Sequence, residues 1–246
     1  MNGNVAQNVL TGLEAGSVSA LLRGESRALR AWCERWDAGR AALWVGLIIA
    51  GAGLYGGAMG CWRSPLAAAF VAIKFPLIIL LVTLGNALLN AMLAPLLGLN
   101  LGLRQSILAV LASFAIASVI LGAFSPLILF MVWNAPPMTP KPLDSAGTYS
   151  FIQLTHVSII AFAGLAANLR LAQLLRELSG SVAVARRVLV AWLAGNLFLG
   201  SQLCWLLRPF IGSPALPVEF LRPDAFRGNF YETLFHAVAR LVGSVD

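Results

Sequence analysis

Two histidines, His156 and His236, are the side chains best suited to ligand chemistry in this sequence. Two histidines on one side of a membrane can ligate a haem iron, and a lone histidine can ligate the magnesium of a chlorin pigment or bond a quinone. We favour a simpler interpretation, in which His156 is a neutral histidine bonded to a neighbouring helix. We therefore predict no resident cofactor and no metal site, and haem, pigment or quinone binding at His156 is the alternative.

Four amide side chains fall inside apolar runs of the sequence: Asn86, Asn90, Asn196 and Gln202. Asn86 and Asn90 are four residues apart, so they share one face of a helix. Buried amides in lipid need partners, and hydrogen bonds between helices usually supply them. A transport pathway could use the same residues, but ion and proton pathways usually carry an acidic or basic side chain. The predicted spans contain none apart from His156, so we expect structural hydrogen bonds.

Glycines one helical turn apart form two overlapping pairs in the first apolar run, Gly53 with Gly57 and Gly56 with Gly60. Small residues at this spacing let two helix backbones approach closely. We predict a packing face for another helix, either of this chain or of a partner. The alternative is that the pattern reflects composition alone, because glycine is frequent in membrane spans.

Catalysis has little support in the sequence. No carboxylate falls in the predicted spans, so no acid–base pair is evident, and we predict that the protein is not an enzyme. The three cysteines, Cys33, Cys61 and Cys204, form no CxxC pair, which argues against a zinc site. Cys61 and Cys204 are both expected near the outer face, so a disulfide between them is open, although two single cysteines are favoured.

The composition explains why these residues must be positioned by membrane helices. Of 246 residues, 59% are hydrophobic and only 11% are charged, and the mean hydropathy is +0.82. Soluble domains carry roughly 25% charged residues. The net charge of +7 comes from basic residues in short segments between apolar runs. Such residues orient a chain and contact anionic lipid, so we expect membrane lipids and no nucleic acid as partners.

Five runs are long and apolar enough to span a bilayer: 41–61, 75–97, 105–133, 149–169 and 188–207. Residues 64–73 are apolar but too short to span. We expect them to form an interfacial helix or an extension of the second span, with a break at Lys74 caused by Pro76. The proline-rich stretch 134–148 is expected to form an extended outer loop.

These spans divide the chain into three parts. Residues 1–40 form an amphipathic N-terminal segment, 41–207 the membrane domain, and 208–246 a proline-rich segment ending in a short amphipathic helix over 230–242. With five spans, ten basic residues fall on the N-terminal side: Arg23, Arg27, Arg30, Arg35, Arg40, Arg104, Arg170, Arg176, Arg186 and Arg187. Only seven fall on the other side. The bias favours a cytoplasmic N-terminus and a periplasmic C-terminus.

Two stretches, 54–84 and 202–222, resemble a family of uncharacterised bacterial multi-span inner-membrane proteins. In that family a YG…MG helix end precedes a K-x-P helix start, and the chain closes with W-x-L-R-P-F-I-G-x-P. The arrangement is also loosely similar to five-span Yip1-like proteins, which are thought to act in membrane organisation. The resemblance implies fold and location but no catalytic residue. Its closing motif corresponds here to Trp205, Arg208, Pro209, Phe210, Gly212 and Pro214.

Within this motif, we expect Arg208 to reach the outer interface, where it could bind a lipid phosphate or a partner's carboxylate. Taken together, the sequence predicts an all-α integral membrane protein with five spans and amphipathic helices at both termini. We expect a non-catalytic structural or accessory subunit of a larger membrane complex, packing through the glycine face and the terminal segments. The alternatives are a small-molecule channel or transporter acting as an oligomer, and a pigment- or haem-binding subunit.

Overall fold

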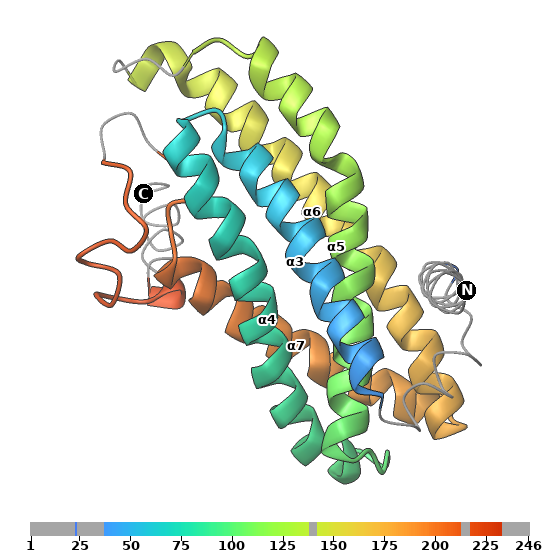
Figure 1. The fold of residues 1–246 in the computed structure, drawn as a ribbon. Coiled ribbons are helices and arrows are strands. Elements are labelled where there is room, and N and C mark those ends of the chain that lie inside the picture. Colours follow the sequence, from blue (N-terminus) through green and yellow to red (C-terminus); the bar gives the residue numbers. More distant parts are fainter. Residues whose placement is uncertain (1–22, 24–36, 138–141, 213–216, 233–246) are drawn as a thin grey trace, which may run out of the picture.

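The computed structural model describes Arg23 and residues 37–137, 142–212 and 217–232. Five helices in this part of the chain are long and apolar enough to cross a membrane (Figure 1). They are α3 (Ala38–Gly60), α4 (Pro65–Leu96), α5 (Leu103–Asn134), α6 (Pro142–Ser179) and α7 (Val182–Leu206). The described residues contain no strand. The predicted all-α, five-span membrane fold is therefore confirmed.

Several predicted features lie outside the described residues. They are Cys33, Pro214, His236, nearly all of the N-terminal segment 1–40, and the part of the C-terminal helix beyond residue 232.

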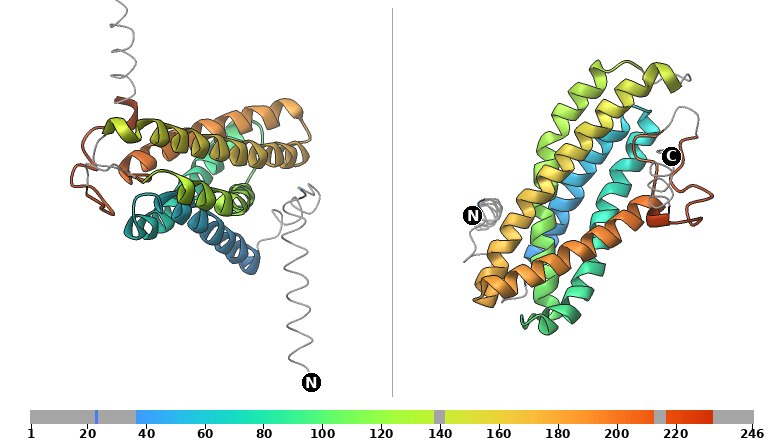
Figure 2. Two further views of the ribbon diagram at one scale, coloured as in Figure 1. Left: turned by 90° about the horizontal axis from the view of Figure 1, so that it is seen from above. Right: turned by 180° about the vertical axis from the view of Figure 1, so that it is seen from behind.

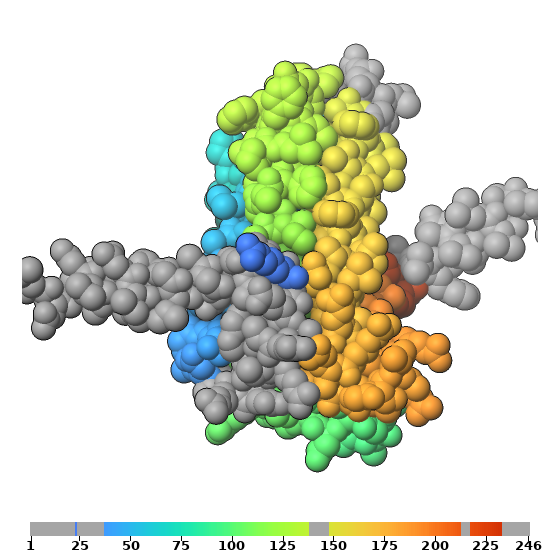
Figure 3. Space-filling model, turned by 90° about the vertical axis from the view of Figure 1, so that its right-hand side faces the viewer, coloured from blue at the N-terminus to red at the C-terminus, as the bar shows by residue number. Residues whose placement is uncertain are grey.

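The middle of the bundle is α5, which packs against α3 and α6. Seen from above, α3 and α4 lie on one side of α5 and α6 on the other (Figure 2, left). Figure 3 looks onto the face on which α5 and α6 lie side by side. The large core side chains include Trp44, Ile48, Leu108, Ile128, Leu174 and Leu175. The core thus sits where these three helices meet.

The last helix, α7, packs differently from the others. It crosses α4 obliquely, and it joins α6 through a short turn (Figure 1; Figure 2, right). Only 17% of the most apolar 18-residue stretch of α7 is buried inside the chain, against 56% of the corresponding stretch of α5. α7 is therefore an edge helix with most of its surface turned outward.

Local sequence signals explain where the helices begin and end. The side chains of Asp37, Ser64 and Ser181 each accept a hydrogen bond from a backbone N–H in the first turn of the helix that follows. Gly98 and Gly180 follow the ends of α4 and α6 with φ of 92° and 63°. Glycine adopts this left-handed backbone without steric cost, so it ends a helix readily.

The predicted break at Lys74 is wrong. α4 runs without interruption from Pro65 through Lys74 and Pro76 to Leu96, so the second span absorbs the short apolar run before it. Pro76 has no N–H to donate to the carbonyl of Ala72. The backbone of α3 lies against that carbonyl, since a Cβ on Gly53 would stand 3.3 Å from its oxygen. Close packing on α3 therefore supports the helix through the proline.

Two other boundaries differ from the prediction. α6 begins at Pro142 and not near Tyr149, so the second half of the expected outer loop is helical. Proline is favoured in the first turn of a helix, because the missing N–H would have no partner there. α7 begins at Val182, six residues before the predicted start at Val188. Cys61 and Cys204 form no disulfide with each other, because both are free thiols.

Candidate functional site

A lysine lies inside the second span, which contradicts the expectation that the spans are uncharged apart from His156. Lys74 is nine residues into α4, or about 14 Å along the helix axis. Its side chain is only 1% exposed. Ionisable groups at such positions are costly and usually carry a function. Lys74 is therefore the first candidate for a functional residue.

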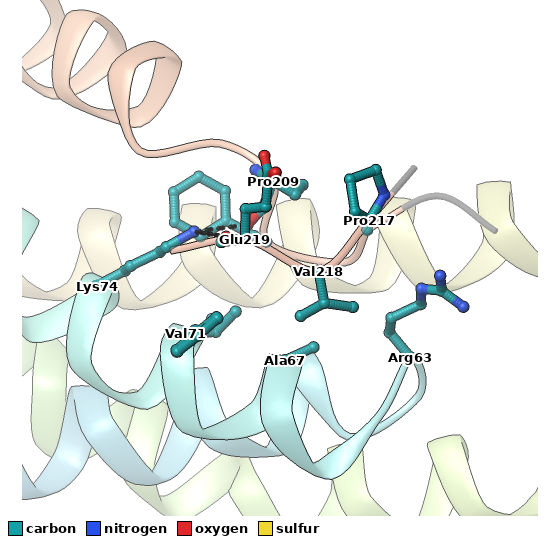
Figure 4. A pocket seen from close by; sticks show the side chains of 11 residues that line it. Arg63, Ala67, Val71, Lys74, Pro209, Pro217, Val218 and Glu219 are labelled. Carbon is teal, nitrogen blue, oxygen red and sulfur yellow. Dashed lines mark hydrogen bonds between the residues drawn. The ribbon is translucent and has the colours of Figure 1, made fainter. Parts of the chain in front are cut away.

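The ammonium group of Lys74 is bound by the segment that follows α7. Its Nζ donates hydrogen bonds to the carbonyl oxygens of Pro209 at 3.4 Å and Glu219 at 3.2 Å. It also stands 5.3 Å from the ring centroid of Phe220, a cation–π distance. Both acceptors are backbone groups outside regular structure, which need donors where water is scarce. Lys74 supplies these donors. It thereby holds the C-terminal segment, the described residues 207–212 and 217–232, against α4 (Figure 4).

The space beside Lys74 is small. A cavity of about 20 Å³ lies between α4 and the segment, and its walls include Arg63, Val71, Lys74, Pro209 and Val218 (Figure 4). Room for one water molecule takes about 10–15 Å³ by this measure. The cavity is therefore too small for a substrate. We call the contact between α4 and the C-terminal segment a junction, because it joins two parts of the chain and leaves no binding pocket.

Arg208 reaches partners within its own chain. Its Nη1 donates to the carbonyl oxygen of Trp205 at 2.6 Å, and its guanidinium carbon lies 3.6 Å from the centroid of the Trp205 ring. Its Nη2 lies 3.9 Å from a carboxylate oxygen of Asp224. Burial and the charge of Arg222 lower the pKa of Arg208, while Asp224 opposes them. The guanidinium nevertheless stays protonated at physiological pH. Arg208 thus binds the last turn of α7 through Trp205 and the segment after it through Asp224.

The other residues of the closing motif lie in the same junction. The carbonyl of Pro209 binds Lys74, and the ring of Phe210 makes an edge-to-face contact with Phe75 at 6.5 Å. Gly212 has φ of 85° and packs on the Arg63 side chain. The structure therefore brings the described part of the motif together around the N-terminal half of α4.

His156 forms a second buried polar site, between α6 and α3. The ring is 3% exposed, and its Nδ1 lies 2.8 Å from the hydroxyl oxygen of Tyr55. Tyr55 is fully buried, and its ring stands at 88° to the imidazole. Within the part of the chain that the structure describes, the imidazole Nε2 has no hydrogen-bond partner. Gln153, one turn before, is exposed.

Two of the four amides bind one another across the α4–α7 crossing. Asn86 donates from Nδ2 to Asn196 Oδ1 at 2.6 Å and to the Trp192 carbonyl at 3.4 Å. Asn90 is 1% exposed, and neither polar atom of its side chain has a partner among the described residues. Gln202 is half-buried near the end of α7. A polar contact thus attaches the edge helix to the rest of the bundle.

We expect the Asn86–Asn196 contact to contribute measurably to stability. Replacing both residues with leucine should reveal a coupling of about 0.6 kcal/mol, and at most about 1.7 kcal/mol, as for other hydrogen bonds inside membrane proteins. A double-mutant cycle on unfolding in mixed micelles measures this value. The Asn86→Leu and Gln202→Leu pair is the control, and it should be additive. Equal coupling in both cycles would contradict the assignment.

The four glycines of the predicted packing face lie on α3 against α4 of the same chain. A Cβ on Gly56 would come within 2.6 Å of the Val71 carbonyl oxygen, and one on Gly60 within 2.7 Å of the Ala67 carbonyl oxygen. Real Cβ atoms essentially never approach other atoms this closely. The helix that the glycines accommodate at these positions is therefore α4 and not a helix of another chain.

Two residues of these sites, Lys74 and Tyr55, are not predicted from the sequence. The sequence places Lys74 at a helix boundary, although the lysine opens the K-x-P pattern of the resemblance. Tyr55 belongs to the YG…MG pattern, and its one local signal is a tyrosine in an otherwise apolar helix.

No family model, curated protein or solved structure matches the chain. The resemblance to bacterial inner-membrane proteins and to Yip1-like proteins stays a prediction. In the described residues, no three histidine, cysteine or carboxylate side chains are placed to hold a metal ion together.

Proposed function

We propose that this multi-pass protein is a non-catalytic structural or accessory subunit of a larger complex in the bacterial inner membrane. The observation that carries the proposal is the low burial of α7 within the chain. It is the least buried span, and exposed apolar side chains follow its outer surface: Val190, Leu193, Leu197 and Phe198. Asn196 fixes the other side of the helix to α4. An edge helix that is anchored on one side offers a surface for a helix of another protein.

The packing of the remaining polar groups supports the same proposal. Lys74, His156 and Asn86 each bond to another element of this chain. The glycines face α4 internally, so α7 is the better candidate for the surface that binds a partner. We propose a cytoplasmic N-terminus, because Arg40, Arg104, Arg176 and Arg187 lie towards one end of the bundle.

Site-specific photocrosslinking tests whether a protein covers α7. A photoreactive benzoyl-phenylalanine at Leu197 should crosslink a defined membrane protein in intact cells. The same residue at Met92 of α4 is the matched control, since the exposed fractions are 70% and 72%. Mass spectrometry of the complex, purified in nanodiscs, should identify the same partner. Lipid-only products at both positions would contradict the proposal.

A channel or transporter acting as an oligomer is the second candidate, and Lys74 is the observation that favours it. An ionisable residue in a span marks many ion pathways. Here both acceptors of its ammonium group are backbone carbonyls of the C-terminal segment, which favours anchoring. A liposome flux assay on the purified protein distinguishes the two functions. A pigment- or haem-binding subunit is the third candidate, and a visible absorption band of the purified protein would support it.

A further inference from the structure

The C-terminal segment lies where the last candidate span ends. α7 is long and apolar enough to cross a bilayer, and the segment follows directly after its last residue, Leu206 (Figure 1). The segment stays beside α4, because Lys74 binds two of its carbonyls and the ring of Phe220 packs edge-to-face on Phe70 at 5.6 Å. It is therefore held at the depth where α7 leaves the hydrocarbon, which is the level of the lipid headgroups.

Two apolar side chains of this segment are turned outward. Phe226 is 77% exposed and Leu221 is 43% exposed, although both lie outside the helices. The residues just before them, Ala225 and Phe220, pack inward instead. One side of the segment thus contacts the protein, and the other presents apolar groups to its surroundings. At headgroup depth, such side chains become buried at the boundary with the acyl chains.

Two arginines share one carboxylate beside these apolar side chains. Arg222 Nε lies 3.2 Å from Asp224 Oδ1, and Arg208 Nη2 lies 3.9 Å from Asp224 Oδ2. Burial and the charge of Arg222 lower the pKa of Arg208, so the two guanidinium groups are near enough to repel each other. Asp224 balances only one of the two positive charges. An additional anion at this place would relieve the repulsion.

The two arginines differ in the donors that they have left to offer. Arg208 is held by the end of α7, because Nη1 donates to the Trp205 carbonyl and the guanidinium stacks on the Trp205 ring. Arg222 contacts Asp224 through Nε, and its two terminal nitrogens have no partner among the described residues. Its side chain is 27% exposed, so these N–H groups are accessible. Their fork geometry matches two oxygens of a phosphate.

We propose that Arg222, next to Arg208, binds the phosphate of an anionic membrane phospholipid. Leu221 and Phe226 lie among its acyl chains. A phospholipid fits both parts of the surface, because it joins a phosphodiester to apolar chains at one depth of the bilayer. A soluble phosphate would occupy the arginines only. A zwitterionic lipid would bring its own cation to a place that already holds excess positive charge, so a lipid with net negative charge is favoured.

Native mass spectrometry of the full-length protein tests the site by titration with dioleoyl-phosphatidylglycerol or dioleoyl-phosphatidylcholine. We expect the wild type to bind phosphatidylglycerol more tightly. Arg222→Gln should weaken this binding at least about tenfold, because hydrogen bonds from a charged group are worth at least that factor. Arg227→Gln is the matched control and should bind like the wild type. Arg227 is exposed on the same segment, but its charge does not act on Arg208.

A second variant separates a lipid from a bare anion. Phe226→Ser removes a side chain that the protein leaves exposed, and it should weaken phosphatidylglycerol binding about three- to tenfold without affecting folding. An excess of glycerol phosphate, a soluble phosphate monoester, should leave the lipid bound. Three results would overturn the proposal: equal affinity of the wild type for both lipids, equal affinities of the Arg222 and Arg227 variants, or displacement by glycerol phosphate, which would mean that the arginines bind soluble anions.

Discussion

Replacing Gly51 with alanine is expected to destabilise the protein by about 1–3 kcal/mol, the usual cost of overpacking a core. A Cβ at this position would collide with the backbone carbonyl of Ser118 on α5. The partner backbone is equally close, since a Cβ on Gly122 would stand 2.9 Å from the Gly51 Cα. Neither side can rotate a side chain away, so α3 and α5 would have to separate. Thermal unfolding of the purified protein in detergent measures the loss.

The control for this prediction lies in the same helix. A methyl group added at Gly46 would have no atom within 4 Å, and this glycine is exposed. Gly46→Ala should therefore stabilise the protein by up to about 1 kcal/mol, because alanine favours a helix over glycine by that amount. The two substitutions are chemically identical and have opposite expected signs. If Gly51→Ala matched the wild type in stability, α3 and α5 would have to lie farther apart than the structure shows.

The glycines also illustrate a limit of sequence reasoning. The spacing of Gly53, Gly56, Gly57 and Gly60 predicts a packing face, but the spacing does not rank its members. Gly57 has only ordinary contact, with a Cβ–Cβ distance of 3.6 Å to Ala72, whereas Gly56 and Gly60 leave no room for a methyl group. The rotation of α3 about its own axis decides which glycines meet the α4 backbone. With glycines on several sides of the helix, the sequence does not define that rotation.

The five spans are predictable because hydropathy reports burial in lipid directly. The error at Lys74 has a physical cause. Pro76 breaks an isolated helix, and a lysine usually ends an apolar run, so both local signals favour a boundary. The helix continues because its partners are distant in sequence: Gly53 lies against it on α3, and Pro209 and Glu219 bind the lysine. No local pattern reports contacts with residues of another helix or of a segment more than a hundred residues away.

For His156, too, the sequence predicts one part of the site and leaves another part open. Its position in an apolar run predicts a neutral ring that needs a hydrogen-bond partner, because a charged imidazole is costly in lipid. The identity of that partner depends on which helix lies opposite, and the structure places Tyr55 of α3 there.

The second large effect is expected from replacing Lys74 with methionine, which has a similar shape and no charge. The change leaves the carbonyls of Pro209 and Glu219 without their donor. Hydrogen bonds from a charged group contribute about 1.5–3 kcal/mol each, and an orphaned buried carbonyl costs a further amount. The helices themselves keep their backbone bonds and their apolar contacts. We therefore expect the C-terminal segment to leave α4 while the bundle stays folded.

Ala225 provides the reporter for this release, because it is 1% exposed and belongs to the segment. In a protein whose native cysteines are replaced by alanine, an Ala225→Cys thiol should react slowly with a water-soluble maleimide. Adding Lys74→Met should raise the rate at least about tenfold, since 1.4 kcal/mol corresponds to a factor of ten. Adding Arg227→Met instead removes an exposed charge from the same segment and should leave the rate unchanged. Equal rates in the Lys74 and Arg227 variants, with helix content preserved by circular dichroism, would show that the segment is held by its apolar contacts and not by the buried lysine.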